Sequence, residues 1–319
     1  MRVVFMGTPE FAVPSLQALL DNGVQVVGVV TQPDRPVGRK RILTPTPVKV
    51  EAEKHGIPVL QPERLRRPES VEELKELQPD LIVTAAYGQI LPKSVLELPK
   101  HGCINIHASL LPKYRGGAPI HHAVMNGDAV TGVTIMYMAE GLDTGDMISK
   151  VEVSIEDTDT QGTMFEKLSI AGARLLTETL PDLIAGRIQA VPQNDAEAIY
   201  SPNITREQEL IDWNRSALAI WNQVRGLSPR PGAYTLWNGE VLKIWSCLKP
   251  DAALNPSSAN TSQPGTVLGM GENGIVVATG SGTITITELQ PAGKKAMDAA
   301  QWTRGGQLSI GTVLGSAEQ

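Results

Sequence analysis

Over the first 190 residues, short runs rich in Val and Ile alternate with stretches of helical periodicity. This alternation constrains the fold more than any other feature of the chain. It is typical of a mostly parallel, doubly wound α/β sheet with helices on both faces, which binds ligands at the carboxyl ends of its strands. The expected strands are 3–6, 24–31, 81–85, 103–107 and 133–138, and the expected helices include 48–55, 70–78 and 160–185.

The pattern changes after residue 190. Residues 191–206 lack a periodic core pattern and contain Pro192 and Pro202, which predicts a linker. A helix near 214–226 is expected next. Short strands are then expected at 233–238, 241–248, 264–269, 274–279 and 282–289, with a loop over 255–263 between the second and the third. These elements favour a small β-barrel of the oligonucleotide-binding type. We therefore expect an α/β domain over 1–190, a linker over 191–206 and a smaller β-barrel domain over 207–319.

The acidic charge of the chain is unevenly distributed. The net charge is −6, yet residues 206–319 hold nine basic and nine acidic side chains, so the excess acid lies in 1–205. Within that acidic part, residues 35–49 contain no acid and hold the cations Arg35, Arg39, Lys40, Arg41 and Lys49. The first four of these cations lie in a segment of sixteen residues, 32–47, between an expected strand and helix, whereas βα loops usually have about 2–6 residues. A long basic loop on an acidic protein predicts local contact with a polyanion.

Several classes of protein are disfavoured. The two cysteines, Cys103 and Cys247, are too far apart in sequence to suggest a disulfide framework or a cysteine zinc site, and we expect no metal. No apolar run approaches the roughly 20 residues of a membrane span, and the N-terminus leads straight into a strand, so a cytoplasmic protein is expected. The first βα turn, at Gly7, has only one glycine of the dinucleotide-binding pattern, and no phosphate-binding loop is found.

The most informative segment is 103–117. If 103–107 is a strand, then Asn105 and His107 project to one face while Ile104 and Ile106 project to the other. An amide and an imidazole at a strand end must find partners or face a cavity. A loop rich in Pro and Gly follows directly and is suited to wrap a ligand.

A second segment, 141–146, ends another expected strand and offers carboxylates between glycines. Asn, His and Asp form a sensible set for acyl transfer, because the amide donates to a developing oxyanion, the imidazole donates or moves protons, and the carboxylate orients the imidazole. The residues by themselves leave Asp143 and Asp146 as equal candidates for the carboxylate.

Segments 105–117 and 141–146 resemble the signature of folate-dependent formyltransferases, especially the branch that acts on methionyl-tRNA. Segments 7–12, 31–36 and 289–297 are similar as well, so the resemblance extends over nearly the whole chain. It implies transfer of a formyl group from 10-formyltetrahydrofolate to methionyl initiator tRNA, for translation initiation, by a monomer. The implied intermediate is a tetrahedral oxyanion stabilised by Asn105 and His107, with Asp143, rather than Asp146, assisting.

The resemblance also implies binding residues. The folate-contacting residues would be Ser109, Leu110, Leu111 and Pro112, together with Tyr87, Gly88, Gln89, Ile90 and Leu91. Among the cations of the basic loop, we expect Arg35, Arg39, Lys40 and Arg41 to contact tRNA. Two alternatives stay open: a formyltransferase acting on a small-molecule amine, whose known members lack the basic loop, and a non-catalytic RNA-binding protein on the same fold.

Overall fold

The computed structural model describes residues 1–251, 262–306 and 308–315. Two compact units are present: the first comprises 1–117, 130–154 and 165–201, and the second comprises 118–129, 155–164 and the chain from 202 onward. Most of the loop expected over 255–263 lies outside the described residues. Within the described residues, no helix has the length and apolar character needed to span a membrane.

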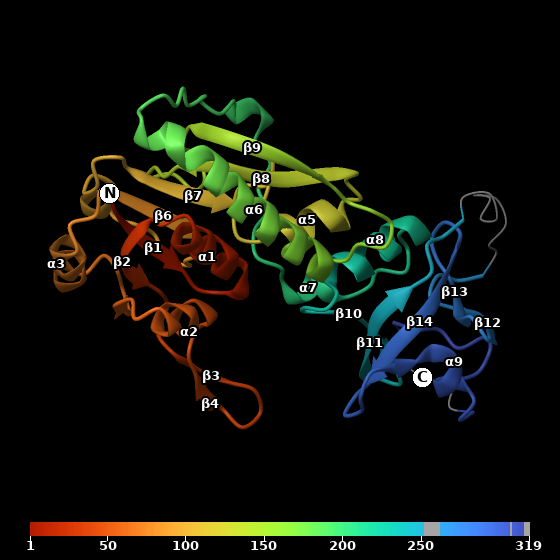
Figure 1. Ribbon diagram of the computed structural model, residues 1–319. Helices are drawn as coiled ribbons and strands as arrows, with labels where there is room; N and C mark the ends of the chain where they lie inside the picture. The colour runs from red at the N-terminus through yellow and green to blue at the C-terminus, as the bar shows by residue number, and fades with distance from the viewer. Residues whose placement is uncertain (252–261, 307, 316–319) are drawn as a thin grey trace. The chain divides into compact units, whose positions relative to one another are not determined.

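The first unit is built on a seven-stranded sheet (Figure 1). Its strands, in spatial order, are β5 (Val59–Leu60), β2 (Gln25–Val30), β1 (Arg2–Gly7), β6 (Leu81–Ala85), β7 (Cys103–His107), β8 (Val130–Tyr137) and β9 (Met147–Ser154). Pairing is parallel from β5 to β7, and antiparallel between β7 and β8 and between β8 and β9. The expected mostly parallel α/β sheet is therefore confirmed.

Alternation along the strands gives the sheet two apolar faces. Val4, Ile82 and Cys103 belong to a core cluster that also contains residues of α3 (Pro68–Glu76) and α4 (Lys93–Leu96). On the other face, Gly172 of α6 (Gln161–Ile184) lies against Ile106, where a Cβ atom on the glycine would come within 2.8 Å of the isoleucine Cγ2. The remaining helical elements of this unit are η1 (Glu10–Ala12), α1 (Val13–Asp21), α2 (Pro47–Lys54) and η2 (Asp195–Glu197).

The basic loop expected between residues 32 and 47 contains a β-hairpin. Strands β3 (Arg35–Val37) and β4 (Ile42–Thr44) pair antiparallel, and a turn joins them at 38–41. The base of the hairpin is fixed by a hydrogen bond of 2.7 Å between the hydroxyls of Thr31 and Thr46 and by an ion pair of 2.8 Å between Lys49 and Asp34. What the sequence predicts as an irregular loop is thus a strand pair, because Arg35–Val37 and Ile42–Thr44 have each other as hydrogen-bonding partners.

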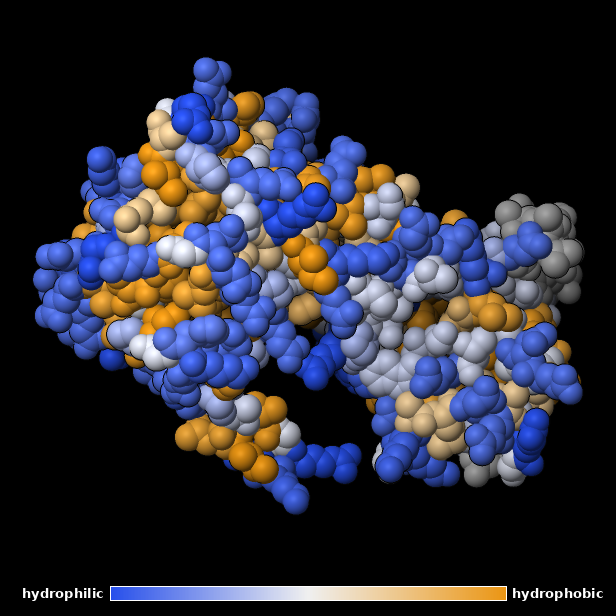
Figure 2. Space-filling model, in the orientation of Figure 1, coloured by the Kyte–Doolittle hydropathy of each residue, from blue (hydrophilic) through white to orange (hydrophobic). Residues whose placement is uncertain are grey.

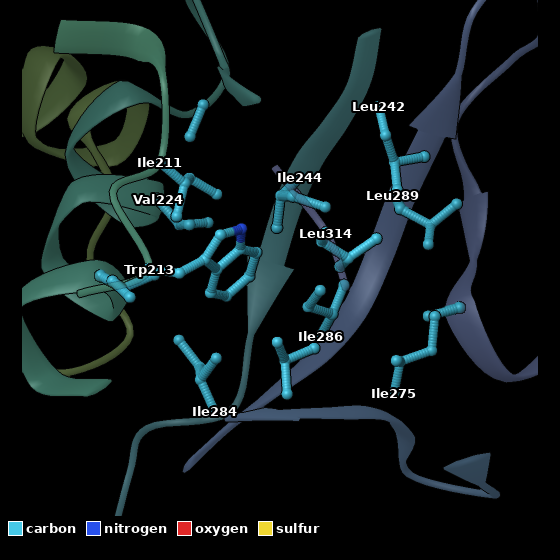
Figure 3. Packing of buried hydrophobic residues seen from close by; sticks show 14 of the residues in the cluster. Ile211, Trp213, Val224, Leu242, Ile244, Ile275, Ile284, Ile286, Leu289 and Leu314 are labelled. Atoms are coloured by element: carbon cyan, nitrogen blue, oxygen red, sulfur yellow. The ribbon is translucent and has the colours of Figure 1, made fainter. Parts of the chain in front are cut away.

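The second unit contains an antiparallel sheet with the strand path β10 (Ala233–Trp237), β11 (Glu240–Cys247), β14 (Thr283–Pro291), β13 (Gly274–Ala278) and β12 (Val267–Gly271), and β15 (Met297–Asp298) pairs with β14. Its helices are α5 (Pro119–Met125), α7 (Arg206–Glu209), α8 (Ala217–Leu227) and α9 (Ala299–Thr303). Trp213 lies in the core among aliphatic side chains of the sheet (Figure 3). Its indole nitrogen donates to Thr235 Oγ1 at 3.0 Å, so this tryptophan is a core residue.

The expected closed barrel is not confirmed. In the described residues, the edge strands β10 and β12 are not paired with each other. The C-terminal segment instead hydrogen-bonds to both edges: Val267 N donates to Thr312 O at 2.8 Å, and Gly315 N donates to Leu236 O at 2.8 Å. The backbone groups of the two edges are therefore partly satisfied by an irregular segment that the strand pattern of the sequence did not predict.

Candidate active site

The site lies at the carboxyl ends of β1, β6 and β7. Strand β1 lies between β2 and β6, so the strand order reverses there, and ligands of doubly wound sheets bind at such a point. Gly7 ends β1 opposite Ala85, the last residue of β6. A Cβ atom on Gly7 would lie 2.7 Å from Ala12 Cβ and 2.9 Å from Ala85 O, so only glycine fits this turn. The turn brings the backbone of both strand ends to the switch point.

Asn105 is half-buried on β7 and paired in register with Thr84 of β6. Its Oδ1 lies 2.8 Å from the Thr84 hydroxyl, which also lies 3.0 Å from Ile104 O and has a single proton to donate. In the part of the chain that the structure describes, no group accepts from the Asn105 amide nitrogen. With the amide oxygen facing Thr84, both amide N–H groups remain to donate to a ligand.

His107 ends β7, and its side chain is only 7% exposed. Its Nε2 lies 2.8 Å from the backbone carbonyl oxygen of Tyr114. Because a carbonyl oxygen only accepts, Nε2 carries a hydrogen atom and donates it there. The other ring nitrogen, Nδ1, lies 3.7 Å from Asp143 Oδ2, which is longer than a hydrogen bond. Nδ1 is therefore the ring nitrogen that can engage a ligand between His107 and Asp143.

Asp143 occupies the left-handed backbone region, with φ of 52°. Its Oδ2 accepts a hydrogen bond of 2.8 Å from Gly116 N, which attaches segment 141–146 to the loop after β7. Asp146, in contrast, is exposed directly before β9, and its carbonyl oxygen accepts from Tyr137 N. The fold thus brings Asp143 next to His107, a choice that local sequence reasoning left open.

These three side chains form a partly enclosed polar group. Asn105 offers unused amide donors, His107 offers Nδ1, and Asp143 brings a negative charge beside that nitrogen. Donors held in advance around one point stabilise an oxyanion that develops there. The arrangement therefore suits acyl transfer through a tetrahedral intermediate.

The loop after His107 is held to the neighbouring strand by Thr134, a buried residue of β8 that faces His107 in register. Its hydroxyl donates to Ser109 O at 2.7 Å and accepts from Leu111 N at 3.1 Å. Ser109 and Leu111 are buried, and the Ser109 hydroxyl donates to Lys113 O at 2.6 Å. Leu110 and Pro112 are half-buried. In segment 109–112, only these last two side chains are accessible to a ligand.

The loop over 87–91 follows β6 directly. Tyr87 and Leu91 are buried in a core cluster, Gln89 donates to Pro62 O at 3.0 Å, and Gly88 and Ile90 are exposed. Burial raises the pKa of the Tyr87 phenol well above its usual range. The parts of this loop that can meet a ligand are therefore its backbone, the half-buried Gln89 and the side chain of Ile90.

Neither a cysteine nucleophile nor a metal site is supported by the described residues. Burial raises the pKa of the Cys103 thiol to about 12, so this cysteine is not a nucleophile near neutral pH. No group of three or more His, Cys, Asp or Glu side chains that could hold a metal ion is found in the described ranges.

The hairpin carries the basic side chains. Arg39, Lys40 and Arg41 are exposed in its turn, and none of the three forms an ion pair within the described chain. Arg35 pairs with Glu63 at 3.2 Å, and both side chains are exposed. Apolar side chains are also exposed beside the turn, as the orange atoms on the hairpin in Figure 2 show. They are Val37, Ile42 and Leu43, which are 57%, 62% and 65% exposed.

The sequence matches two parts of one family. Residues 1–180 match the formyl transferase domain, and residues 203–307 match the formyl transferase C-terminal domain. The chain belongs to the formyl transferase family. This formyl transferase is 58% identical to the methionyl-tRNA formyltransferase of Bacillus subtilis (strain 168), over 98% of both chains. It is 60% identical to that of Geobacillus thermodenitrificans (strain NG80-2), over the same share of both chains.

Solved structures share the fold of this formyl transferase at lower identity. An N-formyltransferase from Helicobacter canadensis, in complex with folinic acid and dTDP-3-aminofucose, has a TM-score of 0.65 and 19% identity, covering 89% of this chain and 98% of its own. HypX from Aquifex aeolicus, in complex with tetrahydrofolic acid, has a TM-score of 0.63 and 18% identity, covering 97% of this chain and 48% of its own. At these identities the likeness shows the fold alone.

Sequence reasoning missed two threonines that organise the site of this formyl transferase. Thr84 orients the Asn105 amide, and Thr134 fixes the backbone of segment 109–111. The available signal was a hydroxyl in the middle of an otherwise apolar expected strand, because a buried hydroxyl needs a partner. The partner of such a hydroxyl depends on the register between strands, which cannot be read from a single sequence.

Proposed function

We propose that the chain transfers the formyl group of 10-formyltetrahydrofolate to the amino group of methionine carried by initiator tRNA. The observation that carries this proposal is 58% identity to the Bacillus subtilis methionyl-tRNA formyltransferase over 98% of both chains. Identity of that extent covers the catalytic strand β7, the hairpin and the second unit together.

In the proposed mechanism, the neutral amine attacks the formyl carbon, and negative charge develops on the formyl oxygen. The Asn105 amide nitrogen donates to that oxygen, and His107, in the protonated form in which both ring nitrogens carry hydrogen, donates to it from Nδ1. This assignment is supported by the unused donors of Asn105 and by the hydrogen bond that commits Nε2 of His107 to Tyr114. Asp143 orients the imidazole from 3.7 Å. The amine proton ends on the folate nitrogen that leaves.

The folate is proposed to bind at the carboxyl ends of β1, β6 and β7. Two observations support the fit: the site lies at the topological switch point, and Asn105 has amide donors available for a formyl oxygen. The contacts are assigned to Leu110 and Pro112 through side chains, to Ser109 and Leu111 through the backbone, and to Tyr87, Gly88, Gln89, Ile90 and Leu91 on the other side. Because Tyr87 and Leu91 are buried in the core, their share of the contact would also come from the backbone.

The tRNA is proposed to approach over the hairpin. Strand β2 leads into it, and β2 runs parallel to β1 and β6, so the hairpin starts from the same sheet edge as the catalytic residues. The cations Arg39, Lys40 and Arg41, which form no ion pair with any described residue, fit RNA phosphates, and the exposed Val37, Ile42 and Leu43 fit a partner that covers them. Arg35 is assigned a weaker contact because Glu63 already pairs with it.

The domain boundaries, the oligomeric state and the location of the protein are also proposals. We place the functional boundaries at 1–190, 191–206 and 207–319, with tRNA affinity supplied by the last segment, and expect a monomer. A cytoplasmic location fits an enzyme of translation initiation.

The proposed function is tested by an assay with 10-formyltetrahydrofolate and three acceptors: methionyl initiator tRNA, methionyl elongator tRNA and an amino sugar linked to a nucleotide. We expect rapid formylation of the initiator tRNA and little of the others. Preference for the amino sugar would favour the small-molecule alternative, and binding of tRNA without any formylation would favour the non-catalytic alternative.

A further inference from the structure

The catalytic carboxylate proposed above sits on a backbone that needs external support. Asp143 has φ of 52°, in the left-handed region that is unfavourable for a residue with a side chain. Gly145, two residues later, approaches the end of β8 so closely that a Cβ atom there would lie 1.8 Å from Tyr137 O. A segment in such a conformation persists only where its surroundings fix it.

That support comes from Gln193, a residue fifty positions away in sequence. Its amide nitrogen donates two hydrogen bonds of 2.8 Å, one to Asp143 O and one to Gly145 O. The two carbonyls lie on either side of Thr144, so one side chain fixes the backbone around the catalytic carboxylate. Gln193 is half-buried, and it contacts Asp143 through the backbone rather than through the carboxylate.

Gln193 is itself oriented by Arg115. The Arg115 side chain is 2% exposed, and its Nε donates to Gln193 Oε1 at 3.0 Å. Its NH2 group pairs with Asp195 at 2.8 Å. Because a glutamine amide has one acceptor end and one donor end, the bond from Arg115 determines which end faces Asp143. A buried guanidinium therefore sets the direction in which Gln193 donates.

The carboxylate of Asp143 is held by a further hydrogen bond, which comes from the residue next to Arg115. Gly116, the residue after Arg115, donates its N–H to Asp143 Oδ2 at 2.8 Å. Arg115 thus acts on the aspartate along two routes, through Gln193 on the backbone and through Gly116 on the side chain. The arrangement fixes Oδ2 of Asp143 at 3.7 Å from Nδ1 of His107.

We infer that Gln193, oriented by Arg115, is a positioning residue for Asp143, which it holds in the left-handed conformation that directs the carboxylate toward His107. The inference rests on the proposed role of Asp143 in formyl transfer. It adds a residue that touches neither substrate and acts only through the aspartate.

The first test is a pair of substitutions with a matched control. Gln193→Ala removes both donors and the acceptor for Arg115. Gln193→Glu keeps an acceptor for Arg115 and replaces the donors with a carboxylate facing two carbonyl oxygens. Gln189→Ala removes an exposed glutamine four positions away and serves as the control. We expect both Gln193 variants to lower kcat about 10–100-fold, with unchanged KM for tRNA and unchanged folate affinity, because small displacements of reacting groups cost rates of that order.

A double-mutant cycle separates positioning from general destabilisation. In an Asp143→Ala background, Gln193→Ala should cause no further loss of kcat, since the residue acts through Asp143. An equal loss in both backgrounds, or full activity of both Gln193 variants beside a slow Asp143→Ala variant, would overturn the inference alone. Full activity of Asp143→Ala would instead overturn the catalytic assignment on which it rests.

A third measurement does not depend on activity. Hydrogen exchange of the Gly116 amide reports its bond to Asp143 Oδ2. We expect exchange to accelerate at least about tenfold in Gln193→Glu, where Arg115 keeps its partner, and to stay unchanged in Gln189→Ala. Unchanged Gly116 exchange in a folded Gln193→Glu variant would overturn the inference even if formyl transfer were never observed.

Discussion

The imidazole Nε2 of His107 lies 2.8 Å from the carbonyl oxygen of Tyr114, and this bond determines which ring nitrogen is left to face a ligand. Since Nε2 donates to the loop after β7, only Nδ1 remains near Asp143 and the proposed formyl oxygen. One nitrogen stabilises the loop, and the other is the one that we propose acts in transfer. The two roles can be separated by substitution.

Glutamine and asparagine each preserve one of those roles. His107→Gln can place its amide nitrogen near Nε2 and keep the bond to Tyr114, whereas His107→Asn can place its nitrogen near Nδ1. We expect His107→Gln to retain the melting temperature and lose about 10²–10³ in kcat, as when an oxyanion donor is removed. His107→Asn should retain more activity and lose about 1 kcal/mol of stability. Thermal melting and single-turnover formylation measure both, and a reversed ranking would contradict the assignment of the nitrogens.

Asn105 and Thr84 form a second pair that can be separated. Asn105→Ala should lower kcat about 10²–10³-fold, because it removes an oxyanion donor. Thr84→Val keeps the shape of a β-branched side chain but removes the hydroxyl that lies 2.8 Å from Asn105 Oδ1. The amide can then turn, so we expect a smaller loss of about tenfold in kcat with folate affinity retained. If Thr84→Val matched the parent rate, the amide would not depend on Thr84 for its orientation.

The cations at the hairpin turn are predicted to act on tRNA alone. Replacing both Arg39 and Arg41 with Ala should raise the KM for tRNA and flatten its dependence on salt, because fewer counterions are released on binding. Folate affinity should not change. Replacing both Arg174 and Arg187 with Ala, which removes two exposed cations paired with Glu178 and Asp182, is the control for net charge. Equal effects of the hairpin variant and the control would argue against specific phosphate contacts.

The base of the hairpin should respond to acid. Hydrogen bonds from Lys49 and Gln61 hold the pKa of Asp34 below the ordinary value of an aspartate. A carboxyl with a lowered folded-state pKa contributes stability that is present above its unfolded value and is lost as pH falls through the folded value. We therefore expect the hairpin base to loosen only below about pH 4. Carboxyl NMR titration should show the pKa of Asp34 rising in Lys49→Met, and an unchanged value would exclude the ion pair as its cause.

Local patterns in the sequence were enough to predict the elements that carry the site. The strand expected at 103–107 is β7, and the strand expected at 81–85 is β6. Such strands can be predicted because a short apolar run along the sequence indicates a strand that is buried in the sheet. Alternation along the first of these strands put Asn105 and His107 on one face. The hairpin and the open edges of the second sheet were not predicted, since both depend on backbone partners that short segments find only in the folded chain.

The sheet, the strand that ends in His107 and the family of the chain all follow from patterns that can be read along the sequence. Only the tertiary structure decided which carboxylate of segment 141–146 faces His107, which ring nitrogen is free, and that Gln193 holds Asp143 from fifty residues away. The two kinds of feature differ in how far apart in the sequence the interacting residues lie. Periodicity records whether a residue is buried, but the partner of a buried polar atom is chosen by strand register and loop packing, which exist only once distant segments meet.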